Sequence, residues 1–142
     1  MAKEIIKKEN VVFVGYLQSG NAAYNLQTHL SSLGIIASVV SNSKKLRDSI
    51  KRIDKNSYIL IFSKSGKTAS DILEYFQLNN ISYDKVGLVT SNKELYLNNH
   101  IDHLLNLKIE NDMTTEGISL NIVSNIIALK CLELKAKTEE AI

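Results

Sequence analysis

Runs of consecutive apolar residues alternate with amphipathic stretches along this chain. The apolar runs predict strands at residues 11–14, 35–40, 58–62, 86–89 and 104–107. The stretches between them predict helices at residues 19–33, 43–53, 69–78 and 114–137, with a short helix or turn at 93–99. Strands that are apolar at every position are buried on both faces, which is typical of a parallel sheet covered by helices. The sequence therefore predicts an α/β fold, a three-layer α/β/α sandwich around a five-stranded parallel sheet.

The turn after the third predicted strand is rich in hydroxyl groups. It spans residues 63–68, Ser-Lys-Ser-Gly-Lys-Thr, and leads directly into a predicted helix. Amides at the start of a helix lack helical partners, and the helix dipole favours negative charge there. Ser63, Ser65 and Thr68 would add side-chain donors, and Gly66 permits a tight turn close to a ligand. An ordinary Ser/Thr N-cap is the alternative. Three hydroxyls and a glycine within six residues exceed what capping needs, so the turn predicts a phosphate site.

A second turn, residues 15–20 (Gly-Tyr-Leu-Gln-Ser-Gly), follows the first predicted strand. In parallel sheets the carboxyl ends of the strands meet at one edge, and ligands bind there beside the point where the strand order reverses. The two turns therefore predict one pocket with two edges suited to an anion.

Three nucleotide motifs resemble these turns without matching them. A P-loop needs a glycine where Ile61 stands, and the Rossmann fingerprint needs one where Leu17 stands. Flavodoxins carry a similar hydroxyl-rich loop, but after their first strand rather than their third. ATP, NAD and flavin mononucleotide are therefore poor candidates, and we expect neither a cofactor nor a metal.

Composition narrows the class of protein further. The chain has 142 residues, which suits one domain, and a net charge of +2, which is too small to indicate nucleic-acid binding by itself. A single cysteine, Cys131, excludes an internal disulfide and predicts a buried, inert thiol in a reducing compartment. No apolar run is long enough to span a membrane, and the N-terminus lacks the apolar core of a signal peptide. We expect a cytoplasmic protein.

Taken with the motifs above, the chain resembles the sugar isomerase (SIS) domain family over residues 11–134. The family's Ser-x-Ser-Gly-x-Thr signature is complete at residues 63–68. Its Gly-x-Gly-x-Ser turn corresponds to residues 15–19, with departures at Leu17 and Gln18. The resemblance implies a flavodoxin-like topology, one SIS domain at residues 11–142, and the end of a lead-in helix or linker at residues 1–10.

The resemblance also implies a phosphosugar ligand. It assigns the phosphate to Ser63, Ser65, Gly66 and Thr68, and the sugar to Gly15, Gln18 and Ser19.

Two functional classes of the family remain open. The turns and the last helix resemble most closely the effector domains of RpiR/MurR-type regulators, which sense a phosphosugar and control a separate helix-turn-helix domain. The alternative is an aldose–ketose isomerase, which needs a general base. Glu116 is the candidate base, although an acid there also simply favours a helix N-terminus. Because the proline-containing segment of the isomerases is absent, we predict binding without turnover and no DNA contact by this chain itself.

The three histidines are placed by no motif. His100 and His103 have the spacing of some metal pairs, but no third ligand is evident, so we expect them to be exposed at helix ends. His29, on the first long helix, is expected to be a surface or dimer-contact residue.

The final predicted helix is apolar on nearly every side, from Ile118 to Leu134. One face of a sheet cannot cover such a helix, so we predict that it forms a homodimer interface, as SIS domains usually dimerise. Additional core contacts within the monomer are the alternative.

Overall fold

The computed structural model describes residues 1–92, 101–107 and 113–140, with no account of the side chains of residues 113–118. The helices are α1 (Ala2–Lys7), α2 (Gln18–Ser31), α3 (Ser43–Ser49), α4 (Lys67–Leu78) and α5 (Met113–Glu140), and a 3₁₀ turn follows α3 at Ile50–Arg52. The strands are β1 (Val11–Gly15), β2 (Ser38–Val40), β3 (Tyr58–Phe62), β4 (Lys85–Thr90) and β5 (His103–Asn106). All neighbouring strands pair in parallel, in the order β2-β1-β3-β4-β5. The predicted α/β fold and its five-stranded parallel sheet are confirmed.

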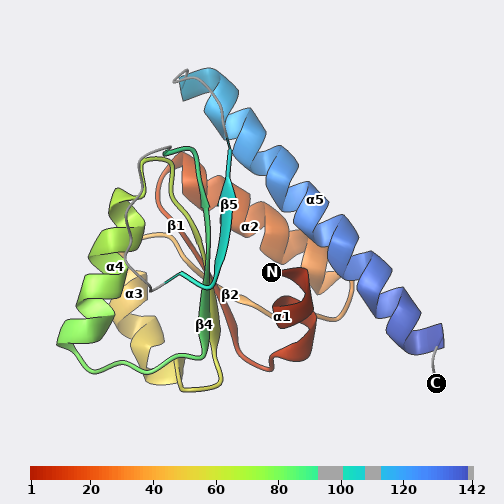
Figure 1. Ribbon diagram of the computed structural model, residues 1–142, viewed down its shortest axis with the longest axis horizontal. Helices are drawn as coiled ribbons and strands as arrows, with labels where there is room; N and C mark the ends of the chain where they lie inside the picture. Colours follow the sequence, from red (N-terminus) through yellow and green to blue (C-terminus); the bar gives the residue numbers. More distant parts are fainter. Residues whose placement is uncertain (93–100, 108–112, 141–142) are drawn as a thin grey trace.

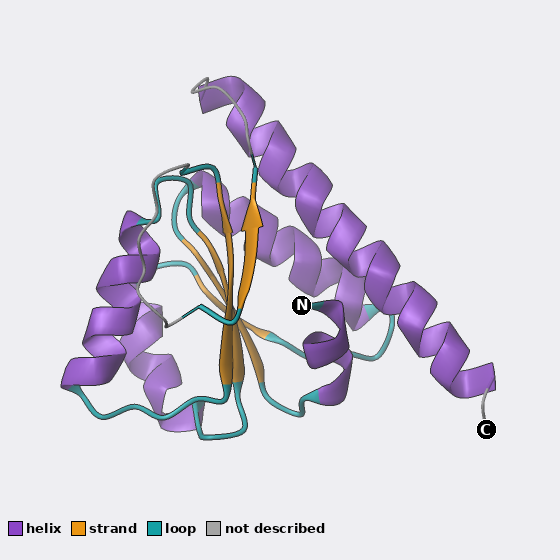
Figure 2. Ribbon diagram, viewed as in Figure 1, coloured by secondary structure: helices purple, strands orange, loops and turns teal. Residues whose placement is uncertain are grey.

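Helices cover both faces of this sheet (Figures 1 and 2). Burial on both faces of the sheet explains why every residue of strand β3 is apolar. Tyr58, Leu60 and Phe62 pack in one core with residues of α1, α2 and α5, whereas Ile59 and Ile61 pack in the other with residues of α3 and α4. Every position of β3 is therefore buried, as the pattern predicted.

Element boundaries differ from the prediction where backbone geometry intervenes. Gly34, with φ 77°, ends the turn after α2, and the N–H of Ile35 donates to the carbonyl of Leu30. This left-handed capping arrangement uses the backbone of Ile35, which therefore cannot begin the strand predicted at residues 35–40. Strand β2 starts at Ser38 instead, and Ile36 is exposed. The helix or turn predicted at 93–99 lies outside the described residues.

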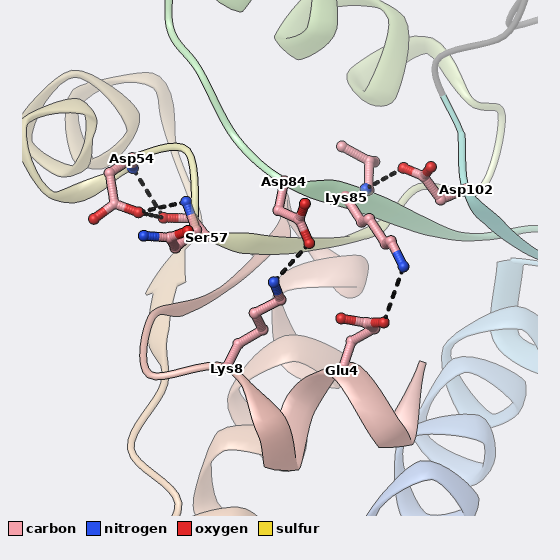
Figure 3. A network of polar contacts seen from close by, with 9 residues as sticks. Glu4, Lys8, Asp54, Ser57, Asp84, Lys85 and Asp102 are labelled. Carbon is pink, nitrogen blue, oxygen red and sulfur yellow. Dashed lines mark hydrogen bonds and ion pairs between the residues drawn. The ribbon is translucent and has the colours of Figure 1, made fainter.

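The N-terminal helix α1 is held against the amino ends of the central strands (Figure 3). Lys8 Nζ lies 2.6 Å from Asp84 Oδ2, and Lys85 Nζ lies 3.2 Å from Glu4 Oε1. The side chain of Ile5 is buried in the core shared with α2 and α5. The division of the chain at residue 10 stays a prediction, although α1 packs as part of the same core.

The long helix α5 presents two apolar sides. One side, which includes Leu120, Val123 and Cys131, is buried against the sheet and α2. Cys131 is fully buried, as predicted, and burial raises the pKa of its thiol to about 11. The other side exposes Ile122, Ile126, Leu129 and Leu132, and we call these four residues the α5 stripe. Among the described residues, no helix is long and apolar enough to cross a membrane.

Candidate functional site

The turns after β1 and β3 lie at the point where the strand order reverses. Strand β1 pairs with β2 on one side and with β3 on the other, so the chain leaves β1 and β3 at adjacent positions of the carboxyl edge. The amino ends of α2 and α4 lie at this same end of the sheet (Figure 1). Both turns line one cavity of about 480 Å³, a size that suits a small ligand. Its lining residues are Tyr16, Leu17, Gln18, Ser19, Ser63, Lys64, Ser65, Thr68 and Leu120.

The turn after β3 has the geometry of an anion site. Gly66 adopts a left-handed conformation, with φ 79°, and serves as the N-cap of α4 without a capping side chain. The N–H of Lys67 donates to Ser65 Oγ at 3.2 Å. Because a hydroxyl that accepts one bond still carries its own proton, Ser65 remains able to donate to a ligand. The amides of Thr68 and Ala69 lie in the first turn of the helix and have no acceptor within it.

Burial differs among the three predicted hydroxyls. Ser63 is buried at 3% exposure, and its N–H donates to the carbonyl of Val89 at 2.9 Å, which continues the ladder between β3 and β4. Ser65 is exposed and Thr68 is half-buried, and both line the cavity with Ser63. Gly66 shapes the turn but is not itself among the lining residues.

Residues at the end of β4 support this turn from behind. The carbonyl of Lys64 accepts from Thr90 Oγ1 at 2.8 Å and from the N–H of Ser91 at 3.1 Å. Asn92 Nδ2 donates to the carbonyl of Ser65 at 2.7 Å, and Asn106 Nδ2 donates to the carbonyl of Asn92 at 2.8 Å. These contacts hold the backbone of the turn from the two neighbouring strands, and none of them was predicted from the sequence.

The turn after β1 is compact. A Cβ placed on Gly15 would lie 2.3 Å from the carbonyl oxygen of Ser19, so only glycine fits between the end of β1 and the start of α2. The N–H groups of Ser19 and Gly20 donate to the carbonyls of Tyr16 and Leu17 at 3.1 and 3.0 Å. These two amides are therefore used within the turn. Gln18 and Ser19 line the cavity, whereas Gly15 is not among the lining residues and instead sets the shape of the turn.

The family-model comparison agrees with this geometry. The model described as "SIS domain" matches residues 4–132, which is most of the chain. The chain belongs to the SIS domain family. No curated protein sequence matches it.

Solved SIS-type structures share the fold. The chain is 22% identical to Escherichia coli CFT073 c3406, solved in complex with a phosphosugar, covering 95% of this chain and 76% of that one, with a TM-score of 0.76. It is 19% identical to a proposed phosphosugar isomerase involved in capsule formation from Bacteroides fragilis. That match covers 95% of this chain and 77% of the B. fragilis chain, with a TM-score of 0.77. It is 17% identical to the sugar isomerase domain of an RpiR transcription factor from Sphaerobacter thermophilus. That match covers 99% of this chain and 79% of the S. thermophilus chain, with a TM-score of 0.75.

The remaining site candidates lie apart from the cavity or outside the described part of this SIS domain. His29 is exposed in the last turn of α2. The expectation of a helix end is wrong for His103, which begins β5 at the amino edge of the sheet because residues 103–106 pair with β4. Its Nδ1 lies 3.3 Å from the hydroxyl of Tyr58, and burial lowers the pKa of its imidazole. His100 lies outside the described residues, and so does the side chain of Glu116.

No group of three or more potential metal ligands occurs among the residues that the structure describes. The described lining of the cavity includes neither a carboxylate nor a histidine.

The hydrogen bond from Thr90 Oγ1 to the carbonyl of Lys64 can be removed by substitution. A Thr90→Val variant should lower the free energy of unfolding by about 1 kcal/mol, because the carbonyl of Lys64 loses one hydrogen bond and keeps the one from the N–H of Ser91. It should also weaken phosphosugar binding by about tenfold, since the turn is no longer held in place. Calorimetry and thermal unfolding measure the two effects. Thr90→Ser keeps the hydroxyl and is the matched control. Unchanged affinity in Thr90→Val would show that this contact does not position the turn.

Proposed function

We propose that this SIS domain binds a phosphosugar in the cavity between the turns after β1 and β3, and that it serves as the ligand-sensing effector module of an RpiR-type regulator. The observation that carries the proposal is the turn at residues 63–68, which lines the cavity with three hydroxyls at the start of α4.

The phosphate fits this turn for three physical reasons. Its oxygens accept hydrogen bonds, and Ser63, Ser65 and Thr68 supply hydroxyl donors on one wall. The positive end of the helix dipole of α4 favours an anion at the same place. Lys64 also lines the cavity and brings a formal positive charge to it. The E. coli structure with its bound phosphosugar supports a sugar phosphate rather than another phosphate ester as the ligand.

The absence of an acid or histidine from the described cavity lining supports a sensor. Moving a proton between neighbouring carbons needs a group with a pKa near neutrality at the substrate. The similarity to the RpiR domain from S. thermophilus also supports the regulatory role, and DNA contact would then require a separate helix-turn-helix domain. On this proposal the domain binds its sugar in the cytoplasm without a cofactor.

An isomerase is the second candidate. It is favoured by the similarity to the B. fragilis protein and by the position of Glu116 in the first turn of α5, the helix that also brings Leu120 to the cavity.

Hydrogen exchange separates the sensor from the isomerase. We expect a bound phosphosugar in heavy water to exchange the proton next to its carbonyl carbon at the protein-free rate, as followed by NMR. Saturable binding with background exchange supports the sensor. Exchange well above background, abolished by Glu116→Gln, would make the protein an isomerase.

The proposal also includes a homodimer formed through α5. The α5 stripe exposes four large apolar side chains at intervals of three or four residues, which places them along one side of the helix. A second copy that packs its own stripe against this one would remove them from water.

A further inference from the structure

Leu17 combines three unfavourable features at the rim of the cavity. Its backbone has φ 55° and ψ −123°, a conformation that glycine adopts readily and leucine does not. It is the N-cap of α2, a position at which leucine is among the least suitable residues. Its side chain is 91% exposed, so packing in the folded domain does not offset the strain. An exposed leucine alone is ordinary. Strain that persists at a ligand cavity instead points to a role in binding.

The walls of the cavity differ in polarity. Ser63, Lys64, Ser65 and Thr68 make one wall polar, and Gln18 and Ser19 add polar groups on the side of the turn after β1. Leu17 comes from the turn after β1, and Leu120 comes from α5, where its side chain is only 2% exposed. Because these two leucines cannot donate or accept hydrogen bonds, a sugar hydroxyl placed against them loses its water without gaining a partner. A methyl group placed there gains from leaving water.

We propose that Leu17, with Leu120, forms an apolar subsite that selects phosphosugars bearing a nonpolar substituent, such as the methyl of an acetamido group. This inference rests on the proposed phosphosugar site. It assigns to Leu17 the contact that discriminates between an acetamido sugar and the corresponding hydroxyl sugar. The phosphate stays at residues 63–68 in both cases, so both kinds of sugar bind and differ in affinity.

Calorimetry with matched sugar pairs tests the assignment. The probes are N-acetylglucosamine 6-phosphate against glucose 6-phosphate, and N-acetylmannosamine 6-phosphate against mannose 6-phosphate. In at least one pair the wild-type protein should bind the acetamido sugar about tenfold more tightly, the usual scale for small apolar groups in a hydrophobic pocket. Leu17→Gly should remove this preference, so that the two affinities within each pair come within about twofold of each other.

Two further readouts make the result specific. Leu17→Gly should raise the unfolding temperature because glycine relieves the backbone strain, so a loss of preference cannot come from unfolding. Leu17→Met keeps an apolar side chain and should keep the preference.

Each outcome bears on the proposal. Equal affinities within both pairs, or a preference that survives in Leu17→Gly, would overturn the role of Leu17 while leaving phosphosugar binding intact. Failure of all four sugars to bind would overturn this inference, whereas the proposed function would be overturned only if a thermal-shift screen of other pentose and hexose phosphates also found no ligand.

Discussion

A Ser65→Ala/Thr68→Ala double variant should bind its phosphosugar about a hundredfold more weakly than the wild type. Each hydroxyl is expected to donate to a phosphate oxygen, and a hydrogen bond to a charged group contributes about 1.5–3 kcal/mol, or roughly tenfold in affinity or more. Both side chains line the cavity, and neither is buried in the core, so the loss should appear mainly in binding, with folding losing only the exposed bond from the N–H of Lys67 to Ser65 Oγ.

The measurement begins with a thermal-shift screen of pentose and hexose phosphates, because a ligand that binds only the native state raises its stability. Calorimetry with the sugar that gives the largest shift then compares the variants. Ser70→Ala is the matched control, since Ser70 lies in the same helix but is not among the lining residues. If the double variant keeps wild-type affinity while unfolding normally, the turn at residues 63–68 is not the phosphate site.

The sheet could be predicted from the sequence because its strands are apolar at every position. The run at residues 58–62 must be covered on both faces, and the structure covers it with two separate cores. The beginning of β2 could not be predicted from hydrophobicity. Ile35 and Ile36 fit a strand pattern, but the hydrogen bond from Ile35 to Leu30 places the former in the cap of α2. A local backbone bond therefore overrides the apolar pattern there.

The site could be predicted only in its local part. Residues 63–68 carry their hydroxyls, glycine and helix start in one short stretch, so the turn was identified without tertiary information. The contacts of Thr90, Asn92 and Asn106 join segments 14 to 27 residues apart and depend on which strands are neighbours. The contact between His103 and Tyr58 could not be predicted from the sequence for the same reason, because the two residues are 45 positions apart in the chain.

Leu17 shows a different kind of discrepancy. The sequence marks it as a departure from a glycine position in the family pattern, and the backbone keeps the glycine-like conformation around it. The turn holds this conformation with a leucine in place because Gly15 and the bonds from the N–H groups of Ser19 and Gly20 fix its geometry. The departure is therefore more informative about the ligand than about the fold.

The second large effect is expected at the α5 stripe. We expect the wild-type protein to be a homodimer at micromolar concentration and Leu129→Asp to be a monomer. Leu129 is 64% exposed in the monomer and lies within the stripe. In a twofold dimer the substitution occurs on both subunits, and each buried, unpaired carboxylate costs several kcal/mol, so association should weaken by about a hundredfold or more.

Sedimentation velocity across a range of protein concentrations measures this change. Leu78→Asp is the control, because Leu78 is 74% exposed at the end of α4, on the opposite side of the sheet from α5 (Figure 1). It introduces the same charge at a similarly exposed leucine and should leave the dimer intact. A monomeric wild-type protein throughout the micromolar range, or a Leu129→Asp dimer of unchanged strength, would exclude the α5 stripe as the interface. A monomeric wild-type protein would mean that no second copy binds the α5 stripe in solution. An unchanged Leu129→Asp dimer would mean that the dimer forms through another surface.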